Sequence, residues 1–316
     1  MKTTTSPLTP ETLRLLRDRN ARPHIASGAH ADALLRRHVL VQIAESMRQE
    51  KLTALLVKGA ALALTVYPDA AARRMSDIDM LVDEKDQSRA VDALGKRGWL
   101  VAHDSSRPLS TAMFGERLVQ ARVGSMTFTV EVHASLDKMV RRPIAFPDLV
   151  QESSPAPGLE GLSVPGREDH ALLVALHAST HEYRHELALQ DLELLLRSGL
   201  DKRKLSRRAE QFQLRPVMFV MLSVLENLGA ASVNDELVRM FDPGWVRRRF
   251  IARFYDVHRY PPVLGEEVLG FPWVLRQAPL WENPRMFAKG LVKYAGVRVV
   301  ERGLDVVDDV RRRVGS

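Results

Sequence analysis

The sequence predicts an α+β fold, in which a small mixed β-sheet core is followed by an all-helical C-terminal domain. Residues 77–82 and 126–133 alternate polar and apolar side chains with the period of half-buried strands. After residue 166, apolar residues recur only at helical spacing. The 316 residues are enough for two domains that each bury a core, and a composition of 45% hydrophobic and 27% charged residues is typical of a folded protein.

Residues 1–51 are expected to form an N-terminal helical segment packed on the core. Thr9-Pro10-Glu11 precedes a leucine-rich stretch, as at the capped start of a short helix, and residues 31–51 carry apolar side chains at helical spacing. The short apolar run 52–57 then ends at Lys58-Gly59. This change of pattern predicts a strand and a turn, followed by an Ala/Leu-rich helix over residues 60–67.

Residues 52–140 are expected to form the sheet core. A loop over 68–76 leads into the strand 77–82, and a helix over 86–97 ends at Gly98. Gly124-Ser125 is a two-residue connection between the strands 117–123 and 126–133, which predicts a hairpin. One face of the last strand should turn Phe128, Val130 and Val132 to the core, and the other should carry Thr129, Glu131 and His133.

The remainder divides into a linker and a helical domain. Residues 141–166 contain five prolines with several Gly and Ser, which predicts the domain boundary there. The helical domain, 167–316, should contain helices over residues 168–200, 205–213, 217–228, 235–241 and 245–255, and at least one more within 285–312.

Composition restricts the possible functions. The chain has no cysteine, which excludes thiol nucleophiles, disulfides and cysteine-rich zinc sites and fits a reducing cytoplasm, the expected location. No stretch supplies the roughly 20 apolar residues that a membrane helix needs, so a membrane is not an expected partner. The net charge of +7 favours an anionic partner, which could be nucleotide phosphate, nucleic acid or an acidic surface.

Three carboxylates are candidates for a metal site. Residues two apart on a strand project to the same face, with their Cα atoms roughly 6 to 7 Å apart, so Asp77 and Asp79 can share a metal ion. Glu131 lies on the polar face of a later strand that can pair in the same sheet. Phosphoryl and nucleotidyl transfer need such clusters, because they hold divalent ions that neutralise a triphosphate and activate the attacking oxygen.

Candidate phosphate ligands lie just before these carboxylates. Lys58, Gly59 and Ala60 stand where a strand turns into a helix, and free N–H groups at a helix start can receive phosphate. Arg73 or Arg74 is expected to contact the same triphosphate. The alternative is that the three cations are surface residues and that Asp77-Ile78-Asp79 is an ordinary solvent-facing strand.

The combined motif is Lys58-Gly59-Ala60-Ala61-Leu62, Tyr67-Pro68, Arg73 or Arg74, Ser76-Asp77-Ile78-Asp79-Met80-Leu81-Val82 and Glu131-Val132-His133. It resembles the uncharacterised nucleotidyltransferase family of the polymerase-beta-like superfamily. That superfamily is marked by a glycine at a strand-to-helix turn, two aspartates two apart on the next strand and a third carboxylate on a later strand. Gly59, Asp77, Asp79 and Glu131 stand at those positions. The resemblance covers roughly residues 52–136, and extends into the helical half through His177, His181 and Asp191.

The resemblance implies an enzyme that uses Mg²⁺, or alternatively Mn²⁺, to move a nucleoside monophosphate from a nucleoside triphosphate to an acceptor, with release of pyrophosphate. The acceptor, a small molecule, a protein or an RNA, is left open. The sequence departs from the superfamily pattern in two ways. It has Gly59-Ala60 in place of a glycine pair or glycine-serine, and the gap between Gly59 and Asp77 is longer. Because Ala60 has no hydroxyl, Lys58 or an arginine would substitute for it. The departures keep open a non-catalytic binding or toxin-like module on a degenerate nucleotidyltransferase fold.

A zinc hydrolase is the rival interpretation. His181-Glu182-Tyr183-Arg184-His185 satisfies H-E-x-x-H, and on a helix the two histidines would share a face with Glu182 as general base. No further ligand motif follows, and Arg184 opposes a cation. Histidines that line a basic cleft or a domain interface are the preferred interpretation, and no bound zinc is expected.

Overall fold

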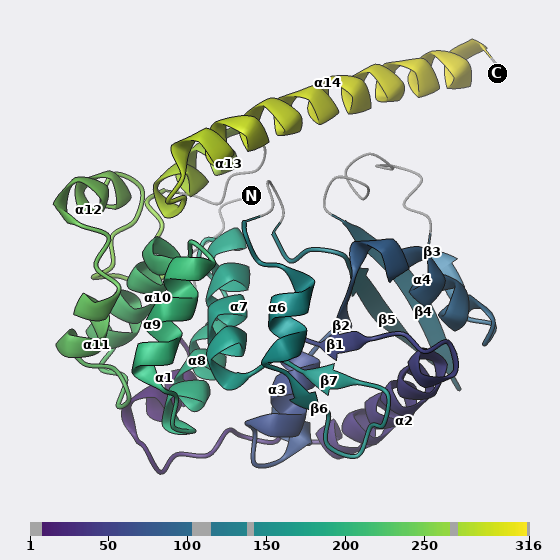
Figure 1. The fold of residues 1–316 in the computed structure, drawn as a ribbon, viewed down its shortest axis with the longest axis horizontal. Helices are drawn as coiled ribbons and strands as arrows, with labels where there is room; N and C mark the ends of the chain where they lie inside the picture. The colour runs from purple at the N-terminus through teal and green to yellow at the C-terminus, as the bar shows by residue number, and fades with distance from the viewer. Residues whose placement is uncertain (1–7, 103–114, 138–141, 266–270, 315–316) are drawn as a thin grey trace.

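A computed structural model describes residues 8–102, 115–137, 142–265 and 271–314. Figure 1 shows the sheet on one side of the molecule, a group of helices packed beside it, and a long C-terminal helix that runs along the top. A mixed sheet joined to a helical region confirms the predicted α+β class.

The sheet has seven strands in the order β3-β4-β5-β2-β1-β7-β6. Parallel pairing of β2 with β5 and of β1 with β7 makes it mixed, since the other neighbours are antiparallel. The predicted hairpin is confirmed, with Gly124 at a φ of 60° between its two strands. The strands are β1 (Ala54–Leu56), β2 (Asp77–Val82), β3 (Leu100–Ala102), β4 (Glu116–Val123), β5 (Met126–His133), β6 (Ser154–Pro155) and β7 (Ser163–Val164).

One face of the sheet is covered by two helices from the first hundred residues. Val39 and Ile43 of α2 share a core with Ile78 of β2 and with Val130 and Val132 of β5. The predicted inward face of β5 is therefore confirmed. The helices and 3-10 turns in this part are α1 (Pro10–Arg17), α2 (Ala29–Gln49), α3 (Lys58–Thr65), η1 (Ala70–Ala72), η2 (Glu84–Asp86) and α4 (Gln87–Gly95).

The opposite face of the sheet packs against the helical half. Leu55, Val57 and Leu81 lie in one core with the leucines of α7 to α10, and Leu15 and Leu16 of α1 join it. The helical elements after β5 are α6 (Phe146–Gln151), α7 (Arg167–Thr180), α8 (Glu186–Arg197), α9 (Lys202–Gln211), α10 (Arg215–Asn227), α11 (Asp235–Met240), α12 (Trp245–Ile251), α13 (Phe271–Gln277), η3 (Ala278–Leu280) and α14 (Pro284–Val314).

Two segments differ from their predicted form. Residues 168–200 are not one helix, because Glu182 and Tyr183 adopt left-handed φ values of 54° and 57° between α7 and α8. The Tyr183 side chain is buried and its hydroxyl donates to the Val217 carbonyl, a tertiary contact that holds the break. Residues 141–166, expected as a linker, contribute α6, β6 and β7, so part of this segment pairs with β1.

Within the described residues, no helix combines the length and the apolar character that a membrane span requires.

Candidate functional site

The pairing of β2 with β5 brings the predicted carboxylates together. Asp79 lies directly beside Glu131 in the register, Asp77 beside Thr129, and Leu81 beside His133. Side chains at paired positions of neighbouring strands project to the same face, and alternate residues along a strand share that face. Asp77, Asp79 and Glu131 therefore stand on the side of the sheet that faces the helical half.

Two basic side chains converge on one oxygen of Asp79. The Lys58 Nζ lies 2.5 Å from Asp79 Oδ1, and the His133 Nε2 lies 2.9 Å from the same atom. His133 Nε2 is also 3.3 Å from Glu131 Oε2. Within the described part of the chain, Asp79, Glu131 and His133 form the group of three residues whose ligand atoms, all within 4.8 Å of one another, could hold a metal ion.

Burial and close charges shift the pKa values of Asp77, Asp79 and Lys58 in this cluster. Burial, together with the charges of Asp79 and Glu131, raises the pKa of Asp77. Burial opposes ionisation of Asp79 too, but the hydrogen bond from His133 and the Lys58 charge hold the pKa of Asp79 well below its usual range. Burial alone would lower the pKa of Lys58, yet Asp79 raises it overall. The site is thus an anionic cluster with Lys58 as its buried counter-charge.

The turn between β1 and α3 carries Lys58, Gly59 and Ala60. Lys58 has a φ of 51°, and α3 starts after Val57 without a side-chain cap, which leaves its first N–H groups available to a ligand. A Cβ atom on Gly59 would lie 3.2 Å from the Arg73 guanidinium carbon. Close approach of Arg73, and not a left-handed backbone, is therefore the local reason for glycine at position 59.

The two adjacent arginines have different surroundings. Arg73 is buried and binds Asp191 of α8 through two hydrogen bonds of 2.8 Å, from Nε and from Nη2. The Tyr67 hydroxyl donates to the same carboxylate at 2.8 Å. Burial opposes the charged form, but Asp191 raises the pKa of Arg73 overall. Arg73 ties the loop before β2 to the helical half, whereas Arg74 is exposed at the cavity described next.

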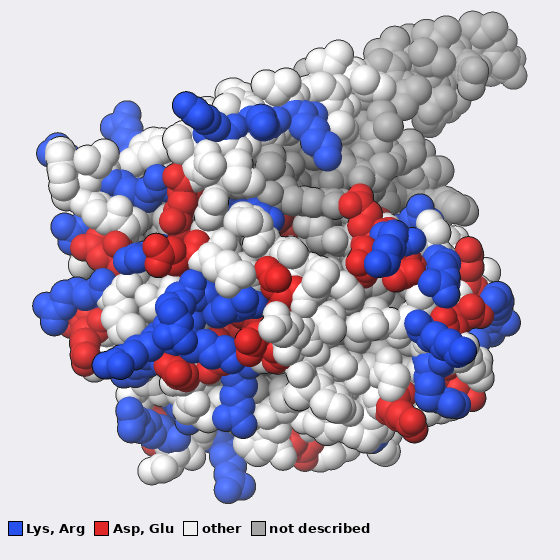
Figure 2. Space-filling model, viewed as in Figure 1, with Lys and Arg blue, Asp and Glu red and all other residues white. Residues whose placement is uncertain are grey.

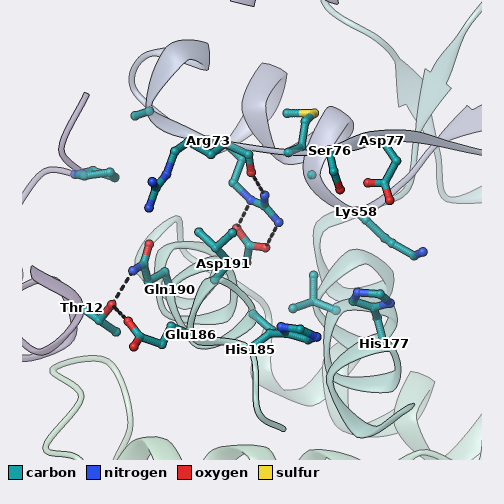
Figure 3. Close-up of a pocket in the computed structure, with 18 of the residues that line it drawn as sticks. Thr12, Lys58, Arg73, Ser76, Asp77, His177, His185, Glu186, Gln190 and Asp191 are labelled. Atoms are coloured by element: carbon teal, nitrogen blue, oxygen red, sulfur yellow. Dashed lines mark hydrogen bonds and ion pairs between the residues drawn. The ribbon is translucent and has the colours of Figure 1, made fainter. Parts of the chain in front are cut away.

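A cavity of about 780 Å³ separates the carboxylates from the helical half. Small-molecule sites typically have volumes of roughly 300 to 1,000 Å³, so the cavity can take a nucleotide-sized ligand. Figure 3 shows Lys58 and Asp77 on one side of it and His177 and His185 on the other. Its lining includes all the predicted site residues except Ala60, and on the helical side Thr9, Glu11, Thr12, His177, His181, His185, Glu186, Gln190 and Asp191.

The helical placement of the H-E-x-x-H motif is wrong. His181 ends α7, His185 precedes α8, and Glu182 lies in the turn between them. The Glu182 side chain is only 3% exposed, and its carboxylate pairs with Arg184 at 3.1 Å and with Arg276 at 3.0 Å, so it is not placed to act as a base on a substrate. The rings of His177, His181 and His185 contact one another in series, with centroids 4.8 and 4.6 Å apart, and all three line the cavity.

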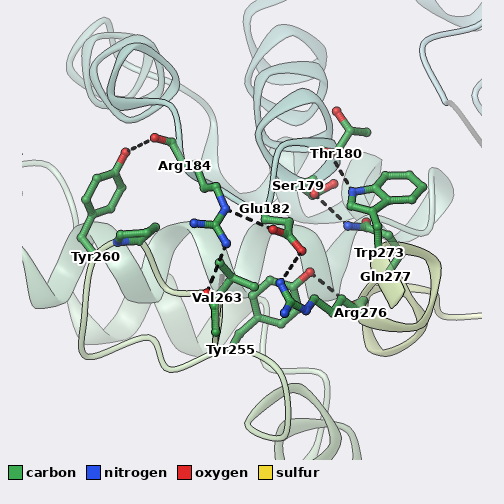
Figure 4. A network of polar contacts seen from close by, with 12 residues as sticks. Ser179, Thr180, Glu182, Arg184, Tyr255, Tyr260, Val263, Trp273, Arg276 and Gln277 are labelled. Carbon is green, nitrogen blue, oxygen red and sulfur yellow. Dashed lines mark hydrogen bonds and ion pairs between the residues drawn. The ribbon is translucent and has the colours of Figure 1, made fainter. Parts of the chain in front are cut away.

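Residues of α13 hold this turn in place. The Trp273 indole donates to the Thr180 carbonyl, and Gln277 donates to that of Ser179, each at 3.0 Å. Figure 4 shows these contacts beside the pairing of Glu182 with Arg184 and Arg276. The histidine wall of the cavity, which we define as His177, His181 and His185, is therefore positioned by residues almost a hundred positions further along the chain.

Some lining residues carried no signal in the sequence. Glu186 of α8 accepts hydrogen bonds from the Thr9 hydroxyl at 2.8 Å and from Thr12, and Gln190 donates to Thr12 at 2.7 Å. These contacts fix α1 to α8 at the edge of the cavity. The partners are more than 170 residues apart, and no local pattern joins residues at that separation.

The structure places a carboxylate pair on one strand, a third carboxylate on the neighbouring strand and a glycine at a strand-to-helix turn, as the resemblance to the nucleotidyltransferase family leads one to expect. Residues 21–229, well over half of the chain, match the family described as uncharacterised nucleotidyltransferase, and the chain belongs to that family. No curated protein and no solved structure matches the chain. All predicted site residues lie within the matched range, whereas α1 and α11 to α14 lie outside it.

Proposed function

We propose that this protein is a metal-dependent nucleotidyltransferase that moves a nucleoside monophosphate from a nucleoside triphosphate to a hydroxyl or another nucleophile of an acceptor and releases pyrophosphate. The observation that carries the proposal is the common face of Asp77, Asp79 and Glu131 at the wall of a nucleotide-sized cavity. The cysteine-free composition favours a cytoplasmic location for this activity.

The chemistry of the donor set fits a hard divalent ion. Asp77, Asp79 and Glu131 offer carboxylate oxygens, which Mg²⁺ and Mn²⁺ prefer. The raised pKa of Asp77 reflects burial and repulsion among these groups, and a bound cation relieves that repulsion. Asp77, Asp79 and Glu131 would hold Mg²⁺ or Mn²⁺, which when bound neutralises the triphosphate and activates the attacking oxygen. Glu131 is alternatively the base that takes the acceptor proton.

The nucleotide would bind through residues on the sheet side of the cavity. Lys58, the N–H groups of Gly59 and Ala60, and Arg74 would receive its phosphates. Support comes from Lys58, Gly59 and Arg74, which line the cavity, and from the start of α3, which has no side-chain cap. Arg73 serves the site indirectly, because its pair with Asp191 holds the loop that carries Arg74.

The acceptor would bind on the opposite side, against the histidine wall and α1. Thr9, Glu11 and Thr12 line this end of the cavity and lie outside the range that matches the family. A lining outside the range that matches the family favours recognition of the acceptor there, since the triphosphate is common to the reaction class.

Labelled nucleotides test the proposal. The protein is incubated with Mg²⁺ and each of the four α-labelled triphosphates, and transfer of label and release of pyrophosphate are measured. Asp77→Asn and Asp79→Asn should each lower the rate by a factor of roughly 10³ or more, because each removes a metal ligand. Asp92→Asn, on the exposed face of α4, is the matched control and should keep the parent rate. An active Asp77→Asn, Asp79→Asn double variant would rule the mechanism out.

A further inference from the structure

The Lys58 ammonium occupies the place of a cation in the carboxylate cluster. Its Nζ lies 2.5 Å from Asp79 Oδ1, and the charges of Glu131 and Asp77 act on it as well. The side chains of Lys58 and Asp79 are only 13% and 5% exposed, so solvent screens this pair weakly. His133 donates to the same oxygen, which leaves Asp79 Oδ1 fully engaged within the protein.

A metal ion that binds Asp79 through this oxygen must displace Lys58. A buried ammonium that loses its hydrogen-bonded partner carries a free-energy penalty, which a new anionic partner would offset. The cavity beside Lys58 is where the triphosphate is expected, and Lys58 stands at the first turn of α3 among the other proposed phosphate ligands. A phosphate oxygen there gives the displaced ammonium a new anionic partner.

We propose that Lys58 makes metal binding and triphosphate binding depend on each other. In the nucleotide-free protein it is the internal counter-ion of Asp79, and it transfers to the phosphates when a divalent ion takes its place. The inference rests on the proposed function for the identity of the anion, but its core, the competition between Lys58 and a cation for Asp79, is a property of the protein alone. The coupling is reciprocal, so each ligand strengthens binding of the other by the same factor.

The competition is tested with Mn²⁺ alone, measured by calorimetry or by the paramagnetic signal of the free ion. Lys58→Met keeps the length of the side chain and removes its charge, and should tighten Mn²⁺ binding by about tenfold or more. Lys58→Arg keeps the charge and should bind Mn²⁺ as weakly as the parent. Lys85→Met is the matched surface control, since the Lys85 side chain is 75% exposed, and should leave the Mn²⁺ affinity unchanged.

The coupling is tested with inorganic tripolyphosphate, which carries the phosphates without a nucleoside. Saturating Mn²⁺ should raise the affinity of the parent for tripolyphosphate by at least about tenfold. In Lys58→Met this gain should be clearly smaller, because the displaced counter-ion no longer contributes. Melting temperatures of all variants establish that they are folded.

The outcomes separate this inference from the proposed function. Equal Mn²⁺ affinity in the parent and Lys58→Met, with binding lost in Asp79→Asn, would overturn the role of Lys58 and leave the metal site standing. Equal tightening in Lys58→Met and Lys58→Arg would also overturn it, because packing and not charge would be the cause. Absence of Mn²⁺ binding in every variant would overturn both proposals.

Discussion

At the scale of single residues, alanine substitutions of the adjacent residues Arg73 and Arg74 should have different effects. Arg73→Ala leaves Asp191 buried without its cation, and loss of one partner of a buried ion pair typically lowers the free energy of unfolding by about 3 to 5 kcal/mol. Arg74→Ala should change that free energy by less than about 0.5 kcal/mol, because its side chain is exposed, and should raise the KM for the triphosphate. Urea denaturation and steady-state kinetics measure the two effects.

A double-variant cycle provides the control. Asp191→Asn combined with Arg73→Ala removes the unpaired charge and should recover part of the stability lost in Arg73→Ala. Equal stability of Arg73→Ala and Arg74→Ala would contradict the assignment of Arg73 to a structural pair.

His170 of α7 predicts a pH dependence of stability. Burial lowers the pKa of His170 to about 4, against an ordinary value of 6.5, and its Nε2 has no hydrogen-bond partner among the described residues. The unfolded chain therefore takes up a proton first as the pH falls. The free energy of unfolding should therefore decrease as the pH falls from 6.5 to 4, by up to about 3 kcal/mol.

Urea unfolding at pH 7, 5.5 and 4.5 measures this loss. His170→Asn does not titrate, and its amide can keep the hydrogen bond to the Lys58 backbone, so its stability should fall less steeply with acid. If the parent and His170→Asn lose stability in parallel, His170 is not the group responsible.

At the scale of elements, the strands that build the site could be predicted because their pattern is local. Alternation in residues 77–82 and 126–133 determines which face each carboxylate occupies, and the register of β2 and β5 agrees with it. The break between α7 and α8 could not be predicted, since Glu182 and Tyr183 are held by Arg276 and Val217, which are remote in sequence. The pairing of Lys58 with Asp79 is likewise a tertiary contact, and β3, β6 and β7 contain only two or three residues, too few to show a period.

The break in the H-E-x-x-H motif leads to a prediction about zinc. The protein should purify without stoichiometric zinc, because Glu182 is committed to two arginines and the motif does not lie on one helix. Elemental analysis of the parent and of His185→Ala should give the same low zinc content. One tightly bound zinc per chain that disappears in His185→Ala would restore the hydrolase interpretation.

At the scale of the whole molecule, the two predicted domains share a hydrophobic core. Leu55, Val57 and Leu81 of the sheet region pack with the leucines of α7 to α10, so the two halves should unfold together. Calorimetry should show one unfolding transition. Leu81→Ala should lower the midpoint temperature of this transition and reduce the free energy of unfolding by about 2 to 5 kcal/mol. Two separate transitions, only one of them shifted by Leu81→Ala, would show that the halves are independent.

The positive charge does not gather into one patch on the face that Figure 2 displays. Lysine and arginine side chains form several separate groups there, and acidic side chains lie beside most of these groups. Several cations of the chain are paired with carboxylates, as Lys204 is with Glu152 and Arg208 with Asp169. On this face, the net charge of +7 does not by itself mark a track for nucleic acid.

The two sides of the cavity differ in how they can change over evolution. Asp79 and Glu131 are carried by β2 and β5, central strands that are each hydrogen-bonded on both sides. The histidine wall and α1 face these carboxylates across the cavity. They are held in place by side-chain contacts of Thr9 with α8 and of α13 with the end of α7. Substitutions that reshape the helical side need not disturb the strands that hold the carboxylates. The ligand bound on the helical side could therefore change through substitutions there while the carboxylate site stays the same.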